Sequence, residues 1–237
     1  MNVRGCSGNG NQFVLKLLYG RERSAALQIL CVGAHCDDIE IGCGATLLAL
    51  QRQYKSCRIH WLILSANAAR RAEALRAMKA FVTVANRGSC EIGSLRDGHL
   101  PAHYSAVKEQ LESVRSKISA DIIFTTHQTD RHQDHRVVGE ATWQTFRDHL
   151  ILEYEIAKYD GGLTPPGCYV PVTRAMAERK TRLLMRLYPT QRIKDWFTDD
   201  AFMSLLRIRG IECRSPSGFA EAFHGSKMVI DSLPSRA

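Results

Sequence analysis

The 237-residue sequence lacks any apolar run of the roughly 20 residues that a membrane-spanning helix requires. It also lacks paired cysteines. Its eight cysteines include no Cys-x-x-Cys pair, so their spacing supports neither a cysteine-rich zinc site nor a disulfide scaffold. The apolar run at 13–18 is interrupted by Lys16 and is too short for the core of a signal peptide. These absences predict a cytoplasmic protein with no membrane span.

The chain contains no run of five Lys or Arg residues, although its formal net charge is +8. The basic residues are spread through the predicted helices, which favours a generally basic surface over a dedicated site for a polyanion. We therefore predict no nucleic-acid partner. The same charge is equally consistent with a phosphorylated or nucleotide-linked small substrate.

From residue 27 onward, short apolar runs alternate with segments of helical periodicity. The expected strands are 27–33, 57–65 and 121–126, and the expected helices are 45–54, 69–81, 106–118, 134–149, 174–187 and 199–209. This alternation predicts an α/β fold with a Rossmann-like, mostly parallel sheet flanked by helices. We expect a polar lead-in at 1–26 and a single domain at 27–237. Sheets of this kind place ligand sites outside the carboxyl ends of their strands.

Two segments rich in histidine and aspartate follow predicted strands directly. They are Ala-His-Cys-Asp-Asp at 34–38 and His-Gln-Thr-Asp-Arg-His-Gln-Asp-His at 127–135. Either segment alone is equally well explained as a polar turn that caps the next helix. Together, at the carboxyl ends of two parallel strands, they predict a metal site, because imidazole and carboxylate are ligands that zinc accepts. A catalytic zinc takes three protein ligands, so we expect the other polar residues around it.

These segments resemble the LmbE-like, or PIG-L, family of zinc-dependent N-deacetylases, in particular its bacterial branch. The family signatures run approximately as His-Pro-Asp-Asp, Gly-x-Gly-Gly and His-x-Asp-His. This chain has His-Cys-Asp-Asp at 35–38, Gly-Cys-Gly-Ala at 42–45 and His-Gln-Asp-His at 132–135. The likeness covers about residues 27–230 and includes shorter matches such as Tyr-Pro-x-Gln at 188–191 and Ala-Glu-Ala-Phe at 220–223.

The resemblance implies a role for each polar residue of the two segments. The metal ligands would be His35, Asp38 and His135. Asp37 would be the general base that takes a proton from the attacking water. His132 would stabilise the oxyanion or pass a proton to the leaving amine, and Asp134 would hold the His132 imidazole in its protonated form. Capping of the following helix is a second interpretation of Asp134.

Three further positions extend or depart from the family pattern. Arg70 resembles the substrate-contacting arginine of the family, and Asp97 a residue that binds a sugar hydroxyl, although a surface ion pair would also explain either residue. Cys36 stands where the family has proline. Because neighbouring side chains of an extended segment point to opposite sides, we expect Cys36 to face away from the metal.

The resemblance implies a metal-dependent hydrolase that removes an N-acetyl or other N-acyl group from a small amino-sugar or glycoconjugate substrate, using metal-activated water. Zn²⁺ is the expected cofactor, and Fe²⁺ suits the same set of ligands. Two alternatives stay open: an amidase acting on a larger N-acyl or thiol-conjugate amide, and a non-catalytic module that binds a nucleotide or a metal. The expected partner is a small N-acetylated sugar-like molecule, and a homo-oligomer is compatible with the sequence.

Overall fold

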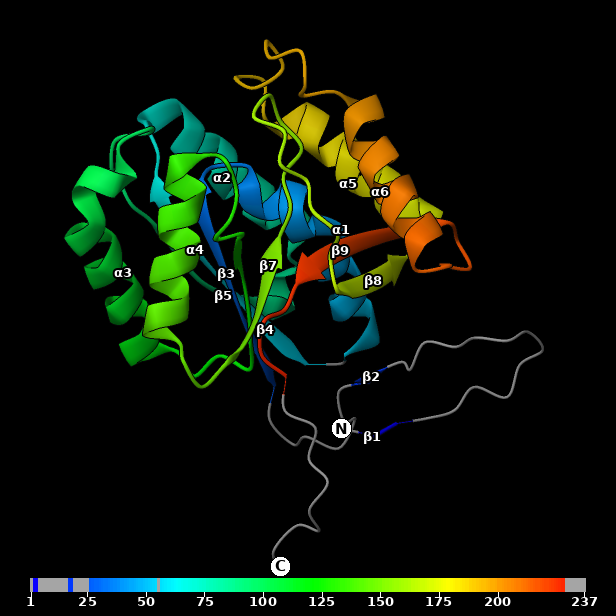
Figure 1. Ribbon diagram of the computed structural model, residues 1–237, viewed down its shortest axis with the longest axis horizontal. Helices are drawn as coiled ribbons and strands as arrows, with labels where there is room; N and C mark the ends of the chain where they lie inside the picture. Colours follow the sequence, from blue (N-terminus) through cyan, green and yellow to red (C-terminus); the bar gives the residue numbers. More distant parts are fainter. Residues whose placement is uncertain (1, 4–16, 19–25, 55, 229–237) are drawn as a thin grey trace, which may run out of the picture.

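The computed structural model describes residues 2–3, 17–18, 26–54 and 56–228. The predicted lead-in at 1–26 therefore lies outside the described residues, except for Ala26 and two short strands, β1 (Asn2–Val3) and β2 (Leu17–Leu18), which pair antiparallel. Residues 26–54 and 56–228 build one sheet and the helices that cover it (Figure 1). In these ranges no helix has both the length and the apolar character needed to cross a membrane.

The sheet has seven strands in the order β5-β4-β3-β6-β7-β9-β8. Their bounds are β3 (Leu27–His35), β4 (Cys57–Ser65), β5 (Arg87–Ile92), β6 (Ile122–Thr126), β7 (Leu150–Tyr154), β8 (Cys168–Val172) and β9 (Phe219–His224). The five strands from β5 to β7 are parallel, whereas β9 is antiparallel to both β7 and β8. The predicted fold class, a mostly parallel sheet flanked by helices, is confirmed.

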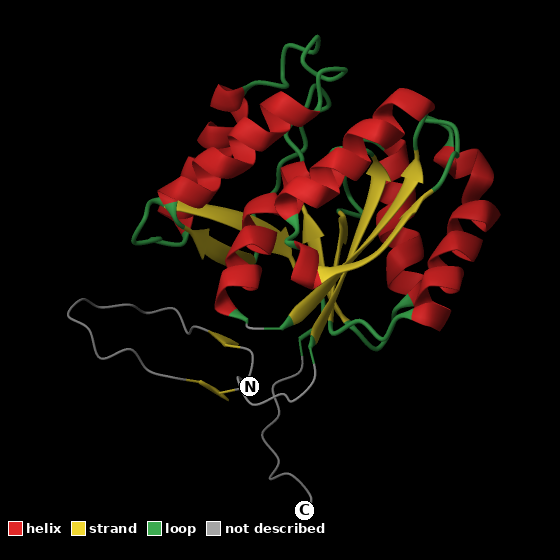
Figure 2. Ribbon diagram, turned by 180° about the vertical axis from the view of Figure 1, so that it is seen from behind, coloured by secondary structure: helices red, strands yellow, loops and turns green. Residues whose placement is uncertain are grey.

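Helices cover both faces of the sheet (Figure 2). Their bounds are α1 (Asp38–Gln53), α2 (Ala68–Phe81), α3 (Tyr104–Lys117), α4 (Gln133–Thr145), α5 (Arg174–Leu187) and α6 (Asp199–Glu212). Two short 3₁₀ helices, η1 (Val84–Asn86) and η2 (Leu100–His103), lie in the connections. One core packs α3 and α4 against the sheet, and a second core packs α1, α2 and α5 against the opposite face.

Strand β3 lies at the centre of the sheet and is buried on both faces. Leu30 and Val32 pack in the core under α3 and α4, and Ile29 and Cys31 pack in the core under α1 and α2. Complete burial of such a side chain stabilises a fold by about 1.5–3 kcal/mol, which explains why this strand is a nearly continuous apolar run.

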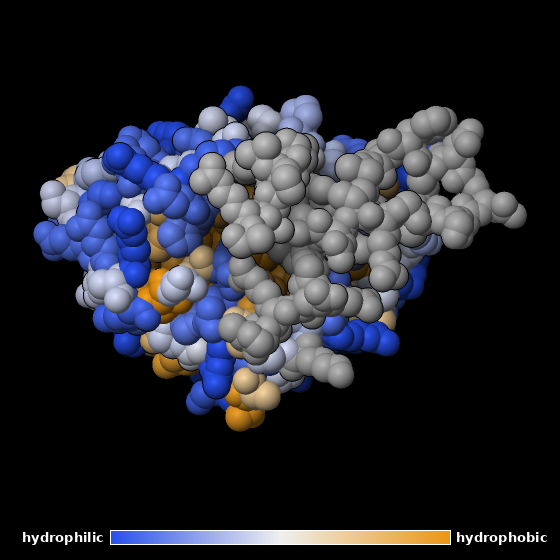
Figure 3. All heavy atoms as spheres, turned by 90° about the horizontal axis from the view of Figure 1, so that it is seen from below, coloured by the Kyte–Doolittle hydropathy of each residue, from blue (hydrophilic) through white to orange (hydrophobic). Residues whose placement is uncertain are grey.

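The side of the molecule seen in Figure 3 lies opposite the carboxyl ends of the parallel strands, and its described surface is mostly hydrophilic.

Several boundaries differ from the sequence expectation. The helix expected at 45–54 begins earlier, at Asp38, and the helix expected at 134–149 ends at Thr145. The strands β5, β7, β8 and β9 were not predicted. Strand β9 contains the buried charge of Glu221, and β8 contains Pro171, and both residue types are rare inside strands.

The buried ion pair between Lys180 and Glu221 hydrogen bonds to the backbone of helix α1. The Glu221 carboxylate accepts hydrogen bonds from the backbone N–H groups of Ala45 (3.0 Å) and Thr46 (2.6 Å), in the middle of the helix. The Lys180 ammonium pairs with Glu221 at 2.6 Å and donates to the carbonyl of Ile41 at 2.5 Å. In an uninterrupted helix that carbonyl would accept from Ala45. The ion pair therefore bridges backbone groups of α1 and ties this helix to α5 and β9.

Gly42 allows α1 to pack directly on β7, which yields a prediction about stability. A Cβ atom at position 42 would lie 2.2 Å from the ring of the fully buried Tyr154. Gly42→Ala should therefore lower the free energy of unfolding, measured by urea titration, by about 1–3 kcal/mol, because overpacking outweighs the helix propensity of alanine. Gly167→Ala, whose Cβ meets nothing within 4 Å, is the control and should stay within about 0.5 kcal/mol. Equal stability of the two variants would contradict the packing.

Candidate active site

The two segments rich in histidine and aspartate meet because β3 and β6 are neighbours in the sheet. His35 is the last residue of β3, Asp37 is the N-cap of α1, and Asp38 begins that helix. The second segment leads from β6 into α4, and His132 is its N-cap. Asp37 adopts a left-handed backbone with φ of 103°, a conformation that aspartate tolerates better than most residues. This conformation lets the chain turn sharply between the strand and the helix.

Three buried side chains converge at this junction. The Nδ1 atom of His35 lies 3.3 Å from Nε2 of His135. The Asp38 carboxylate lies 3.4 Å from His135 Nε2 and 3.6 Å from His35 Nδ1, and it also accepts a hydrogen bond from the His35 backbone N–H. Two imidazole nitrogens and a carboxylate oxygen within 4.8 Å of one another form a set that could hold a metal ion.

The other nitrogen of each imidazole is held by a carboxylate. His135 Nδ1 pairs with Asp130 at 3.0 Å, and His35 Nε2 pairs with Asp134 at 3.1 Å. Such contacts fix the ring orientation and leave the inner nitrogen free to bind a metal. The site residues therefore fit a zinc ion. No role was predicted for Asp130 from the sequence. Its position in the second segment was a signal that it belongs to the site, but the sequence did not show that its carboxylate meets His135.

A second set, formed by His35, His132 and Asp134, also gathers its ligand atoms within 4.8 Å. Both oxygens of Asp134 and the Nδ1 atom of His132 are already engaged in hydrogen bonds. The Asp134 carboxylate accepts hydrogen bonds from the backbone N–H groups of Gly98 (2.7 Å) and Leu100 (3.1 Å). His132 Nδ1 accepts from the backbone N–H of Asp134 at 3.2 Å. The set His35, Asp38 and His135 is therefore the better candidate.

The electrostatics of the site favour positive charge between the two buried rings. Burial acts to lower the pKa of His35, but hydrogen bonds with Asp134, Asp38 and Asp97 raise this pKa well above its usual value. Burial acts to raise the pKa of Asp38, but His135 and His35 hold this pKa well below its usual range. Carboxylates thus surround the two rings, an environment that suits a divalent cation.

Asp37, the expected base, is buried beside this set and pairs with Arg70. Arg70 Nη2 donates to Asp37 Oδ1 at 2.9 Å and to the carbonyl of Cys36 at 2.6 Å. Arg70 Nη1 donates to Asp97 at 3.2 Å, and Asp97 also pairs with His35 Nε2 at 3.0 Å. Burial raises the pKa of Asp37 to about 7, although Arg70 opposes the rise. The structure thus joins the two predicted substrate-binding residues to each other and to the base.

His132 is oriented as a hydrogen-bond donor. Its Nδ1 accepts from a backbone N–H, so in the neutral ring the proton is on Nε2. Burial and the neighbouring rings of His135 and His35 lower the pKa of His132, which favours the neutral form. The sequence interpretation placed the Asp134 carboxylate on His132, but in the structure that carboxylate hydrogen bonds to His35.

Two other polar residues of the motif segments lie away from the candidate metal set. Cys36 is fully buried in the core under α1 and α2, and its Sγ lies 3.9 Å from the Ser65 carbonyl, in agreement with the orientation expected from alternation. Burial raises the pKa of the Cys36 thiol to about 12. His127 hydrogen bonds to Glu153 and stacks on His224, with ring centroids 4.0 Å apart. Among the described residues, the polar partners of these two side chains are Ser65, Glu153, Thr129 and His224, and none of these is a candidate ligand.

The fold and the site together define a class: an α/β protein with a buried imidazole and carboxylate site where parallel strands end. A profile of the PIG-L family, described as GlcNAc-PI de-N-acetylase, matches residues 30–146. The curated protein "Uncharacterized deacetylase YaiS" of Escherichia coli (strain K12) is 30% identical over 142 residues, which cover 54% of this chain and 72% of the relative. The chain belongs to the PIG-L family of deacetylases, which confirms the resemblance found in the sequence.

Solved structures share the fold at lower identity. The N,N'-diacetylchitobiose deacetylase from Pyrococcus horikoshii superposes with a TM-score of 0.65 at 18% identity, and the match covers 84% of each chain. GalB, the 4-carboxy-2-hydroxymuconate hydratase of Pseudomonas putida KT2440, superposes with a TM-score of 0.66 at 15% identity, over 88% of this chain and 100% of its own. One fold thus carries both a deacetylase and a hydratase.

The geometry predicts which histidines a metal requires. Removal of a ligand should weaken zinc binding by more than about 100-fold, the upper end of the effect expected for a supporting residue. His135→Ala should therefore lose zinc, measured by titration with a competing chelator, whereas His132→Ala and the surface control His103→Ala should retain it. The reverse pattern, with zinc retained in His135→Ala and lost in His132→Ala, would assign the metal to the alternative set.

Proposed function

We propose that this protein is a zinc-dependent N-deacetylase that acts on a small N-acetylated amino sugar or glycoconjugate. Membership of the PIG-L family supports the reaction class. The observation that carries the proposal is the Asp37 carboxylate, which is buried beside the candidate ligands His35, Asp38 and His135 but belongs to neither candidate metal set. Amide hydrolysis at a metal site uses a general base beside the metal to accept a proton from water, and a carboxylate that is not a metal ligand can fill this role.

Asp37 carries the proton in both steps of the proposed reaction. Zinc, when bound by His35, Asp38 and His135, supplies Lewis acidity that polarises an amide carbonyl and makes water a better nucleophile at neutral pH. Asp37 Oδ1 is occupied by Arg70, so Oδ2 is left to take the proton as the water oxygen bonds to the carbonyl carbon. The same proton then goes to the amide nitrogen as the C–N bond breaks. The products are acetate and a free amine.

His132 lies beside this reaction as a donor. The Nε2–H group of its neutral ring can donate a hydrogen bond to the carbonyl oxygen as negative charge develops there. Arg70 fixes Asp37 and Asp97 at once, and therefore sets the direction from which the base meets water. In this arrangement Arg70 acts on the substrate through these carboxylates.

The proposed substrate class follows a relative with the same fold. The neighbour from P. horikoshii is titled a deacetylase of N,N'-diacetylchitobiose, an N-acetylated sugar. The shared fold by itself does not select deacetylation, because a hydratase has the same fold. Family membership and the site residues therefore favour deacetylation.

The direct test is acetate release by zinc-loaded protein from a panel of N-acetylglucosamine derivatives and larger N-acyl and thiol-conjugate amides. A deacetylase releases acetate from the sugar derivatives, whereas turnover confined to the larger amides would support the amidase alternative. Zinc binding without turnover of any member of the panel would instead support a non-catalytic module.

Asp37→Asn tests the general base. Asparagine keeps the size of the side chain and accepts the left-handed backbone, but it cannot take up a proton. Zinc affinity should stay close to that of the wild type, and kcat for the best substrate should fall by about 10²–10⁴-fold. A variant with kcat within a few-fold of the wild type would show that another group takes the proton.

A further inference from the structure

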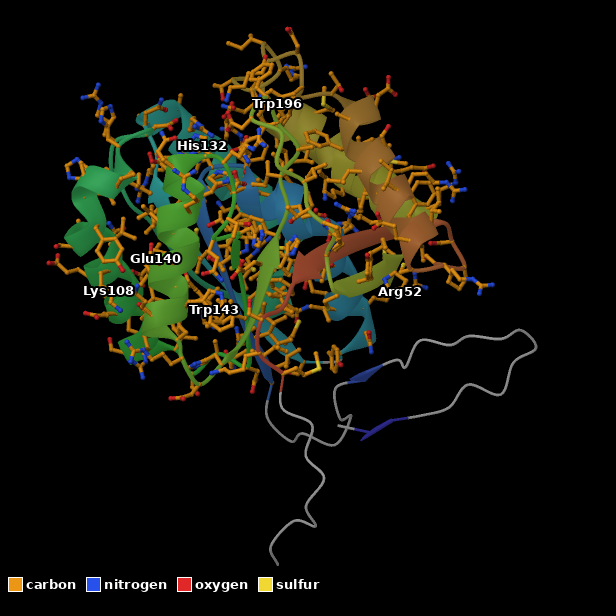
Figure 4. The ribbon with its side chains drawn as sticks, in the orientation of Figure 1. Arg52, Lys108, His132, Glu140, Trp143 and Trp196 are labelled. Carbon is orange, nitrogen blue, oxygen red and sulfur yellow. The ribbon has the colours of Figure 1, made fainter. Side chains whose placement is uncertain are left out.

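Lys158, in the loop after β7, reaches the carboxylate that holds one of the candidate metal ligands. Its ammonium donates to Asp130 Oδ2 at 2.6 Å, and the same oxygen pairs with His135 Nδ1 at 3.0 Å. The other oxygen, Oδ1, accepts from the backbone N–H of His132 at 2.8 Å. Figure 4 shows His132 at the upper end of α4, the end at which the loop after β7 also lies. Asp130 therefore joins Lys158 to a candidate ligand and to the proposed oxyanion donor.

The fold sets the position of Lys158 through its neighbours on the loop. Glu155, three residues earlier, pairs with Arg209 of α6 at 2.5 Å. The hydroxyl of Tyr159, the next residue, accepts from the backbone N–H of Asp195 at 3.0 Å. Residues on both sides of Lys158 are thus held by contacts outside the loop, which limits the directions in which its side chain can extend.

The ion pair between Lys158 and Asp130 is removed from water. The two side chains are 9% and 8% exposed, and among the described residues no other carboxylate lies within 4.0 Å of the ammonium. Loss of one partner from a buried pair leaves the other charge uncompensated, which is far more costly than loss of a surface pair. Lys158 therefore allows Asp130 to remain a buried carboxylate.

A carboxylate at Asp130 determines which nitrogen of His135 is available to a metal. An anionic oxygen beside Nδ1 favours a proton on that nitrogen, so that the lone pair of the neutral ring is on Nε2. His135 Nε2 is the atom that lies 3.4 Å from Asp38 and 3.3 Å from His35 in the candidate metal set. The hydrogen bond to Asp130 therefore turns the ligand atom of His135 toward the other two ligands.

The ammonium of Lys158 has two opposite effects on metal binding. Its charge by itself repels a divalent cation, whereas its contact with Asp130 helps to orient His135. Because the ammonium lies 2.6 Å from an anionic oxygen, that oxygen offsets much of its charge at the longer distance of the metal set. We therefore expect the orienting effect to exceed the repulsion.

We propose that Lys158 is a positioning residue of the metal site, which acts through Asp130 to hold His135 as an Nε2 ligand. The inference rests on the metal set of the proposed function. It adds to that set a residue of the loop after β7, which lies outside both motif segments. Metal affinity then depends on where this loop holds Lys158.

The test is a double-mutant cycle in which zinc affinity is measured by titration with a competing chelator. Lys158→Met should weaken zinc binding about tenfold, and Asp130→Asn by about 10–100-fold, the effect typical of residues that support a ligand. In the Asp130→Asn background, Lys158→Met should weaken binding no further, because the ammonium no longer has a carboxylate to hold. Lys158→Arg should keep most of the affinity, since a guanidinium pairs with the same carboxylate.

Arg209→Met is the matched control, because it removes the cation from another buried pair of the same loop without a contact to the metal set. It should lower the midpoint of urea unfolding and leave zinc affinity close to that of the wild type. Equal weakening of zinc binding in Arg209→Met and Lys158→Met would show that lost stability is sufficient, and would overturn the proposal.

NMR of zinc-loaded protein with labelled histidine examines the ring of His135 directly. The wild type and Lys158→Arg should both show the proton on Nδ1 and the metal on Nε2. Coordination through Nδ1 in the wild type would overturn the proposal, whether or not any variant folds.

Zinc affinity is measured without turnover, so this inference and the proposed function can fail separately. Acetate release by a Lys158→Met variant of unchanged zinc affinity would support the deacetylase and refute the role of Lys158. The expected cycle in a protein that hydrolyses no amide would support the role of Lys158 alone. Tighter zinc binding in Lys158→Met, or equal weakening in the wild-type and Asp130→Asn backgrounds, would also refute this role.

Discussion

The burial of ionisable side chains at the carboxyl edge of the sheet is the constraint around which the structure is arranged. Transfer of an ion out of water costs several kcal/mol unless an opposite charge is close. Here His35 is paired with Asp134, and His135 with Asp130. The His35–Asp134 pair joins the end of β3 to the first turn of α4, so it requires β3 and β6 to be neighbours. The neighbouring positions of β3 and β6 and the start of α4 thus satisfy an electrostatic requirement of the site as well as the packing of the core.

The parallel half of the sheet could be predicted because its strands are buried on both faces. Such strands are continuous apolar runs, and those of β3 and β6 are followed directly by the polar residues of the site. The amphipathic helix α5 was predicted with both ends correct, 174–187. In these elements the local sequence and the final packing favour the same structure, so short-range patterns were sufficient.

The antiparallel strands and several site contacts could not be predicted because they depend on partners far along the chain. Strand β9 contains Glu221, whose charge is compatible with burial only because Lys180 and two helix N–H groups meet it. The contact between His35 and Asp134 joins residues that are 99 positions apart. Arg70 reaches Asp37 only after α2 has packed beside the β3–α1 turn. No local periodicity carries this information, because each contact is a product of tertiary packing.

The ion pair inserted into α1 has a consequence for how this sequence can change over evolutionary time. Lys180 and Glu221 satisfy each other and also three backbone groups of α1. Loss of either partner alone would leave the other charge buried, at a cost of about 3–5 kcal/mol, a large share of the stability of a typical domain. Replacement of both partners together would be far less harmful. We therefore expect the two positions to change together in evolution, because a substitution at one is strongly destabilising until the other has also changed.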